Sequence, residues 1–145
     1  MRTIRTAGEQ DLEFLVAHDR HVSRAEVERL IQARRIDVLE DDGVVQGWLR
    51  WGMFWNTVPF LNMLFLLETE RGIGLGREML SHWERQRAKE GFRKVMTSTA
   101  SNELAQHFYV HMGYVAVGGF FPEPGEPYEL LFRKELPEYP DKDRE

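Results

Sequence analysis

The sequence contains no cysteine. Disulfide bonds, thiolate metal sites, iron–sulfur clusters and a catalytic thiol are therefore excluded, and the composition suits a reducing compartment such as the cytoplasm. Basic residues are also few, because 19 lysines and arginines stand against 24 aspartates and glutamates, giving a net charge of −5. Nucleic-acid binding needs a basic face for phosphate contacts, so we expect no nucleic-acid partner.

Long apolar runs are lacking too. The longest nearly apolar stretch covers residues 58–67 and includes Asn62, which is about half of what a membrane-spanning helix needs. The first residues reach Glu9 and Asp11 before any apolar run of useful length, so we expect no signal or transit peptide. These features predict a cytoplasmic protein that does not enter a membrane.

What the sequence does contain fits one folded domain. Of its 145 residues, 42% are hydrophobic and 30% are charged, which is typical of a globular chain that buries its own core. No internal repeat, low-complexity segment or long linker divides it. We predict a single domain over residues 1–136 and a flexible tail over residues 137–145.

Hydrophobic periodicity and turn residues predict alternating helices and strands. Ser23 and Glu26 form a capping box ahead of a helix, and Asp42-Gly43 favours a hairpin turn. A turn at residues 56–59 leads into a continuous apolar strand. Strands are predicted at residues 2–6, 36–40, 44–54, 60–67, 94–99, 114–121 and 127–134. Helices are predicted at residues 9–19 and 23–34, between the glycine loop and Gly91, and between a capping Asn102 and Gly113, the last with Leu104 on its inner face. This order predicts a mixed α/β fold.

A glycine-rich loop, ERGIGLG, lies between the apolar strand and the next helix. Glycines leave room beside the backbone, and the N-terminus of a helix attracts anions, so the loop suits a phosphate. Arg71 and Arg77 flank the glycines and can add charge-assisted hydrogen bonds. A loop of this kind also occurs as a plain strand-to-helix turn. Gly76-Arg77-Glu78 does not match a P-loop, and Arg77 breaks the dinucleotide pattern GxGxxG.

The loop does match R-x-x-G-x-G through Arg71, Gly74 and Gly76. The segment LFLLETERGIGLG thus resembles the acyl-CoA-binding motif of the GNAT superfamily of N-acetyltransferases. A second GNAT signature, N-x-x-A-x-x-F-Y-x-x-x-G-aromatic, is matched from Asn102 to Tyr114. The resemblance covers about residues 60–114, and it departs from many relatives at Glu68, where they carry a proline.

The resemblance implies a fold and a set of site residues. The fold is a mixed, mostly antiparallel sheet of about six to seven strands, splayed in the middle and flanked by about four helices. Tyr109 matches the family's general acid, although a tyrosine that packs in the core is the alternative, and Asn102 either contacts the cofactor arm, caps its helix or does both. The cofactor is expected in the cleft where the two central strands part. The residues implied to bind acetyl-CoA are Leu64, Phe65, Leu66, Arg71, Gly72, Ile73, Gly74, Leu75, Gly76, Arg77 and Asn102.

The implied activity is transfer of an acetyl group from acetyl-CoA to a primary amine of a small molecule or peptide, by direct attack and without a metal. The apolar strand offers Asn62 where some relatives place a catalytic Glu, so no general base can be named among Asp37, Glu40, Glu68 and Glu129, and a water chain is an alternative. A non-catalytic acyl-CoA-binding or interaction module therefore stays open as the second hypothesis. The oligomeric state is left open between monomer and homodimer.

Two further patterns have a structural and a functional interpretation. His107 and His111 are four residues apart but lack a third ligand, so solvated surface is favoured over a metal site. Most of the aromatic residues between Trp48 and Phe60 are expected in the sheet core. Phe54 and Trp55, close to a turn, can alternatively line an acceptor pocket.

Overall fold

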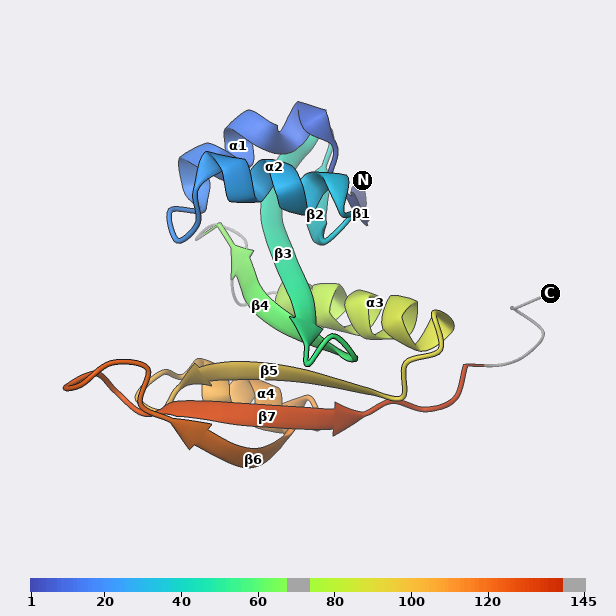
Figure 1. Ribbon diagram of the computed structural model, residues 1–145. Coiled ribbons are helices and arrows are strands. Elements are labelled where there is room, and N and C mark those ends of the chain that lie inside the picture. The colour runs from blue at the N-terminus through green and yellow to red at the C-terminus, as the bar shows by residue number, and fades with distance from the viewer. Residues whose placement is uncertain (68–73, 140–145) are drawn as a thin grey trace. The chain divides into compact units, whose positions relative to one another are not determined.

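The computed structural model describes residues 1–67 and 74–139 of the chain (Figure 1). Over the described residues, the strands are β1 (Arg2–Thr6), β2 (Ile36–Asp41), β3 (Val44–Phe54), β4 (Val58–Leu66), β5 (Lys94–Ala100), β6 (Val115–Phe120) and β7 (Glu129–Glu135). The helices are a short 3-10 turn η1 (Glu9–Asp11), α1 (Leu12–His18), α2 (Arg24–Gln32), α3 (Leu75–Lys89) and α4 (Ala105–His111). The predicted order of elements is confirmed.

The strands form one seven-stranded sheet in the order β1-β2-β3-β4-β5-β7-β6. The β1–β2, β2–β3, β5–β7 and β6–β7 pairs are antiparallel, and β4–β5 is parallel. The β4–β5 ladder pairs Phe60 with Met96 and Leu61 with Thr97, and it is shorter than either strand. The predicted mixed, mostly antiparallel α/β fold is therefore confirmed.

The chain divides into two compact units. Unit 1 is Met1–Trp51 with Met63–Leu80, and unit 2 is Gly52–Asn62 with Ser81–Glu145. The single domain over residues 1–136 stays a prediction, and residues 140–145 of the predicted tail lie outside the described residues.

In unit 1, α1 and α2 pack against each other and against the sheet through an apolar core. The α2 helix begins where predicted, because Ser23 Oγ accepts a hydrogen bond from the backbone N–H of Glu26 at 3.1 Å. Asp19, at the end of α1, is buried and accepts hydrogen bonds from Arg50 Nε at 2.7 Å and Trp48 Nε1 at 3.2 Å. This buried network links α1 to β3.

In unit 2, α4 packs against β5 and β7 (Figure 1). Phe132 and Trp83 are fully buried apolar anchors of this unit. Glu84 of α3 is buried, and its carboxylate accepts hydrogen bonds from Tyr114 Oη at 2.7 Å and Lys134 Nζ at 2.9 Å. These hydrogen bonds connect α3 to β7 and to the residue before β6.

Three local predictions need correction. The predicted turn at residues 56–59 is shifted, because Trp55 and Asn56 both have left-handed φ angles and β4 already begins at Val58. Two consecutive positive φ values form a tight hairpin turn, which the sequence hides because a Trp is uncommon there. Asn102 does not cap α4, since its N-cap is Leu104 with no side-chain cap hydrogen bond. Leu104 itself is 82% exposed rather than inward-facing.

Candidate active site

Tyr109, the predicted general acid, is buried in unit 2. Its ring lies at 5.5 Å from that of Tyr114 and 6.2 Å from that of Phe132, measured between centroids. The phenol hydrogen-bonds with the side chain of Thr97. The residue thus combines the apolar packing of a core aromatic with a polar group held in one place.

Thr97 connects this phenol to the centre of the sheet. Its hydroxyl donates to the carbonyl oxygen of Leu61 at 2.9 Å, and Leu61 and Thr97 are also paired across the parallel β4–β5 ladder. The Tyr109 phenol therefore lies next to the Leu61–Thr97 pair of that ladder. Sequence reasoning missed Thr97, because its role depends on the register of two strands.

Burial sets the ionisation of Tyr109. Burial raises the pKa of the phenol above its usual value near 10, and it outweighs the hydrogen bond with Thr97, which lowers the pKa. The neutral phenol, the form that can donate a proton, is therefore the form present at neutral pH. Such a group is suited to act as an acid rather than as a base.

We expect the Tyr109 phenolate to form only above pH ~10, because the buried phenol keeps its proton. An ultraviolet titration of wild-type protein minus that of Tyr109→Phe isolates this one phenol from the other three tyrosines. A phenolate signal in this difference below the pH of free tyrosine would contradict the burial argument.

The predicted pantetheine-binding segment, Leu64 to Leu66, forms the end of β4 in unit 1. The ring of Phe65 packs on Trp48 with centroids 4.8 Å apart, so this side chain belongs to the core. β3 approaches the segment closely at Gly47. A Cβ built there would lie 2.8 Å from the Phe65 carbonyl oxygen and 2.7 Å from Leu66 Cδ2.

Gly47→Ala is therefore expected to push β3 away from the Phe65 backbone. A carbonyl oxygen cannot move aside as a flexible side chain can, and overpacking of this kind costs about 1–3 kcal/mol. Urea denaturation measures the loss of stability, and CoA titration tests whether the β4 segment has shifted. Gly43→Ala is unsuitable as a control variant because Gly43 has a positive φ. Gly52→Ala is the control with a milder contact, because the new Cβ would lie 3.4 Å from Asn62 Nδ2. Equal losses in the two variants would contradict the proposed clash.

The second half of the predicted phosphate loop begins α3. Gly74 has φ = +82° just before the helix, and its carbonyl accepts from Glu78 N at 3.1 Å. A Cβ built on Gly74 meets no described atom within 4 Å. Leu75 is buried, while Gly76 is half-buried and Arg77 is exposed.

This arrangement fits an anionic group. The backbone N–H groups in the first turn of a helix lack intrahelical acceptors, and the positive end of the helix dipole lies there. α3 has 15 residues, so the dipole of several turns contributes. Arg71, Gly72, Ile73 and Glu68 lie outside the described residues, and their predicted contacts stay predictions.

Asn102 lies in a turn of unit 2 between β5 and α4, and it is exposed. The predicted role of Asn102 as the cap of α4 is wrong, because the N-cap is Leu104. Its predicted contact with the cofactor arm stays a prediction.

The candidate bases are placed in different surroundings. Glu40 accepts a hydrogen bond from Arg5 Nη2 at 3.3 Å, and Asp37 is buried in the same unit. Glu129 of unit 2 accepts from Ser98 Oγ at 2.7 Å and is half-buried. Ser98, the partner of Glu129, also lines a cavity.

That cavity, in unit 2, has a volume of about 460 Å³ and is called the aromatic cavity below. Its polar lining residues are Asn62 and Ser98, with Gly52 beside Asn62. Its apolar lining residues are Met53, Phe54, Phe60, Phe120 and Leu131. Sequence reasoning considered Phe54 for a pocket but missed Ser98, Phe120 and Leu131, which only the strand register brings together.

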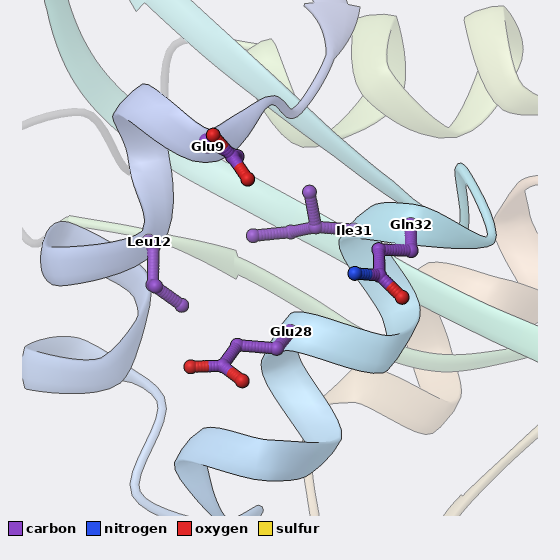
Figure 2. Close-up of a pocket in the computed structure, with 5 residues that line it drawn as sticks. All are labelled: Glu9, Leu12, Glu28, Ile31 and Gln32. Atoms are coloured by element: carbon purple, nitrogen blue, oxygen red, sulfur yellow. The ribbon is translucent and has the colours of Figure 1, made fainter.

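A further cavity, of about 480 Å³, lies in unit 1 between η1, α1 and α2 (Figure 2). Leu12 and Ile31 form its apolar part, and the carboxylates of Glu9 and Glu28 lie at its borders (Figure 2). Among the described residues that line it, none is a sequence-predicted site residue.

Metal sites and membrane spans are two further features that the described residues bear on. Within the described residues, 1–67 and 74–139, no group of three or more His, Cys, Asp or Glu residues is placed to hold a metal ion. His107 and His111 are both exposed. Of the helices just described, none is long and apolar enough to cross a membrane.

Comparison with known sequences places the chain in a family context. The sequence model of the Acetyltransferase (GNAT) family matches residues 6–114. No curated protein matches the chain.

Solved structures share the fold at low sequence identity. An acetyltransferase of the GNAT family from Bacillus cereus has a TM-score of 0.77 and 21% identity, over 94% of this chain and 99% of its own. The ribosomal-protein-S18-alanine N-acetyltransferase from Escherichia coli has a TM-score of 0.81 and 17% identity, over 97% of each chain. N-acetylglutamate synthase from Neisseria gonorrhoeae, complexed with coenzyme A and N-acetyl-glutamate, has a TM-score of 0.80 and 17% identity, over 94% of this chain and 35% of its own.

Proposed function

The chain belongs to the acetyltransferase (GNAT) family, and from this premise we propose that it is an N-acetyltransferase that moves an acetyl group from acetyl-CoA to a primary amine. The proposed acceptors are small molecules or peptides rather than nucleic acid or membrane components. The proposed location is the cytoplasm.

In the proposed reaction, the unprotonated amine attacks the thioester carbonyl carbon, and a C–N bond forms. The carbonyl oxygen becomes an oxyanion, which a backbone N–H of the Leu64 to Leu66 segment would stabilise. The C–S bond then breaks, the Tyr109 phenol gives its proton to the CoA thiolate, and the nitrogen loses a proton to water. Tyr109 recovers its proton from solvent before the next turnover.

One observation carries the proposal: the buried, neutral phenol of Tyr109 lies beside Thr97, which is paired with Leu61 in the β4–β5 ladder. A neutral phenol held at that place can give its proton to a leaving group that forms there. Gly74 and the first turn of α3 support a role in binding the pyrophosphate, because a helix N-terminus attracts anions and a Cβ built on Gly74 meets no described atom within 4 Å.

Calorimetric titration with acetyl-CoA tests the cofactor, with desulfo-CoA and NAD as controls. Binding of both CoA ligands and not of NAD is expected, followed by acetylation of at least one member of an amine library. CoA binding without any turnover would favour the non-catalytic module. Absence of CoA binding would overturn both.

Arg77→Ala tests the phosphate contact separately. It should weaken CoA binding by about tenfold, since a charge-assisted hydrogen bond contributes about 1.5–3 kcal/mol when fully made and less on an exposed side chain. Arg85→Ala, an exposed arginine later in the same helix, is the matched control.

A further inference from the structure

The aromatic cavity lies on the face of the sheet opposite α4. Residues paired across antiparallel strands share a face, and neighbours along one strand alternate between faces. Thr97 and Phe132 are paired, and both contact Tyr109 of α4. Ser98 and Leu131 form the next pair and therefore face the other way, where both line the cavity. The cavity is thus separate from the packing between α4 and the sheet.

Aromatic rings dominate this cavity. Phe54 and Phe60 are stacked with centroids 5.9 Å apart, and Phe120 contributes a third ring from β6. Trp55 extends the aromatic surface, since its ring lies 4.7 Å from that of Phe54 and is 79% exposed. A bulky residue with φ = +55° is uncommon and costs backbone energy. An exposed Trp is thus kept next to the cavity at a position where a smaller residue would fit the backbone better.

The carboxylate of Glu129 faces the same side. Glu129 pairs directly with Phe120 across β6 and β7, so both lie on the face of the cavity. Its carboxylate accepts from Ser98 Oγ at 2.7 Å. The cations that β5 and β7 carry on this face are Lys94 and Arg133, and strand register places both around Glu135. Arg133 Nε is 3.3 Å from the Glu135 carboxylate. The end of the face at the cavity is therefore negative.

From this combination we infer that the aromatic cavity binds the acceptor, and that the acceptor is a primary monoamine carrying an aryl or bulky alkyl group. The inference rests on the proposed acetyl transfer and names its substrate class. The apolar part would occupy the space between Phe54, Phe60 and Phe120, and Ser98 with Glu129 would receive the ammonium end. The ammonium would then lose a proton to water, and the unprotonated amine would attack the thioester. A volume of about 460 Å³ is within the range of small-molecule sites. A polyamine or an aminoglycoside would bring several charges to a lining that is mostly apolar, and leaving them unpaired is costly.

Initial rates with 2-phenylethylamine and putrescine test the substrate class. We expect kcat/KM for 2-phenylethylamine to exceed that for putrescine by at least about 100-fold, the difference that roughly 3 kcal/mol of ring burial provides. Similar values for both amines, or a preference for putrescine, would overturn the inference. The test presupposes that the protein binds acetyl-CoA.

Two neighbouring phenylalanines provide matched variants. Phe120 lines the cavity and Phe121 does not, and both are exposed enough for replacement to leave the fold intact. Phe120→Ala should raise the KM for 2-phenylethylamine about tenfold and leave kcat nearly unchanged, whereas Phe121→Ala should match wild type. Equal KM values in the two variants would contradict the location of the site.

Glu129→Gln tests the charged end. It should weaken binding of 2-phenylethylamine about tenfold and leave binding of the neutral analogue 2-phenylethanol unchanged, both measured by ligand-observed NMR on the protein with and without CoA. Equal effects on the two ligands would contradict the ammonium contact.

The binding measurement also separates the two levels of the proposal. If no amine is acetylated, or acetyl-CoA does not bind, the proposed function fails, but 2-phenylethylamine binding that is lost in Phe120→Ala and kept in Phe121→Ala still supports the cavity as an amine site. If acetylation occurs and 2-phenylethylamine does not bind, the inference fails and the proposed function remains.

Discussion

Tyr109→Phe is expected to lower kcat for acetyl transfer by about 100-fold or more while acetyl-CoA still binds. General acid catalysis contributes about 10²–10⁴-fold, and phenylalanine has no proton to give to the CoA thiolate. The ring itself keeps its packing against Tyr114 and Phe132. Loss of the hydrogen bond with Thr97 costs only about 1 kcal/mol of stability. A thiol reagent can follow CoA release, because the chain has no cysteine to react with it.

Tyr114→Phe is the matched control. Tyr114 is also a buried tyrosine of unit 2, and its phenol donates to Glu84 at 2.7 Å, whereas that of Tyr109 hydrogen-bonds with Thr97. This variant should be less stable, because Glu84 loses a buried donor, but kcat of the folded fraction should be close to wild type. The same fall of kcat in both variants would mean that loss of a buried phenol disturbs the unit in general, and Tyr109 would have no special part in proton transfer.

Local signals in the sequence predict part of the fold. Local signals were sufficient for the strands, the helices and their order, because Ser23, Asp42-Gly43 and Gly113 act on their own neighbours. The wrong predictions concern two positions where the residue type suggests a different local structure from the one observed. Asn102 is a good capping residue, yet α4 starts after Leu104, and Trp55 occupies a left-handed position where a glycine or asparagine is usual.

The candidate site was predicted less completely because it depends on register. Tyr109 and the glycine loop carry recognisable motifs, and the sequence was enough to name them. Thr97, Ser98 and Leu131 carry no motif, and a shift of one residue between β5 and β7 would exchange the residues that face α4 with those that face the cavity. Such a shift is invisible in composition and spacing.

The largest loss of stability is expected from Asp19→Ala. Asp19 and Arg50 are both buried, and the Asp19 carboxylate also accepts from Trp48 Nε1. Removing the carboxylate leaves the Arg50 guanidinium buried without that partner, which costs about 3–5 kcal/mol. Because a domain of this kind is stable by only about 5–15 kcal/mol, the urea midpoint should fall markedly with little change of m-value.

Glu13→Ala isolates burial as the cause. Glu13 and Arg24 form a bidentate pair at 2.8 and 2.9 Å, as short as the Asp19–Arg50 contact, but both side chains are exposed. Water replaces such a partner, so Glu13→Ala should leave the urea midpoint almost unchanged. Adding Arg50→Met to Asp19→Ala should recover part of the lost stability, since the unpaired Arg50 guanidinium is then no longer buried. If the double variant is no more stable than Asp19→Ala, or Glu13→Ala costs as much, the loss does not come from an unpaired buried charge, and the Asp19 network holds α1 to β3 through packing alone.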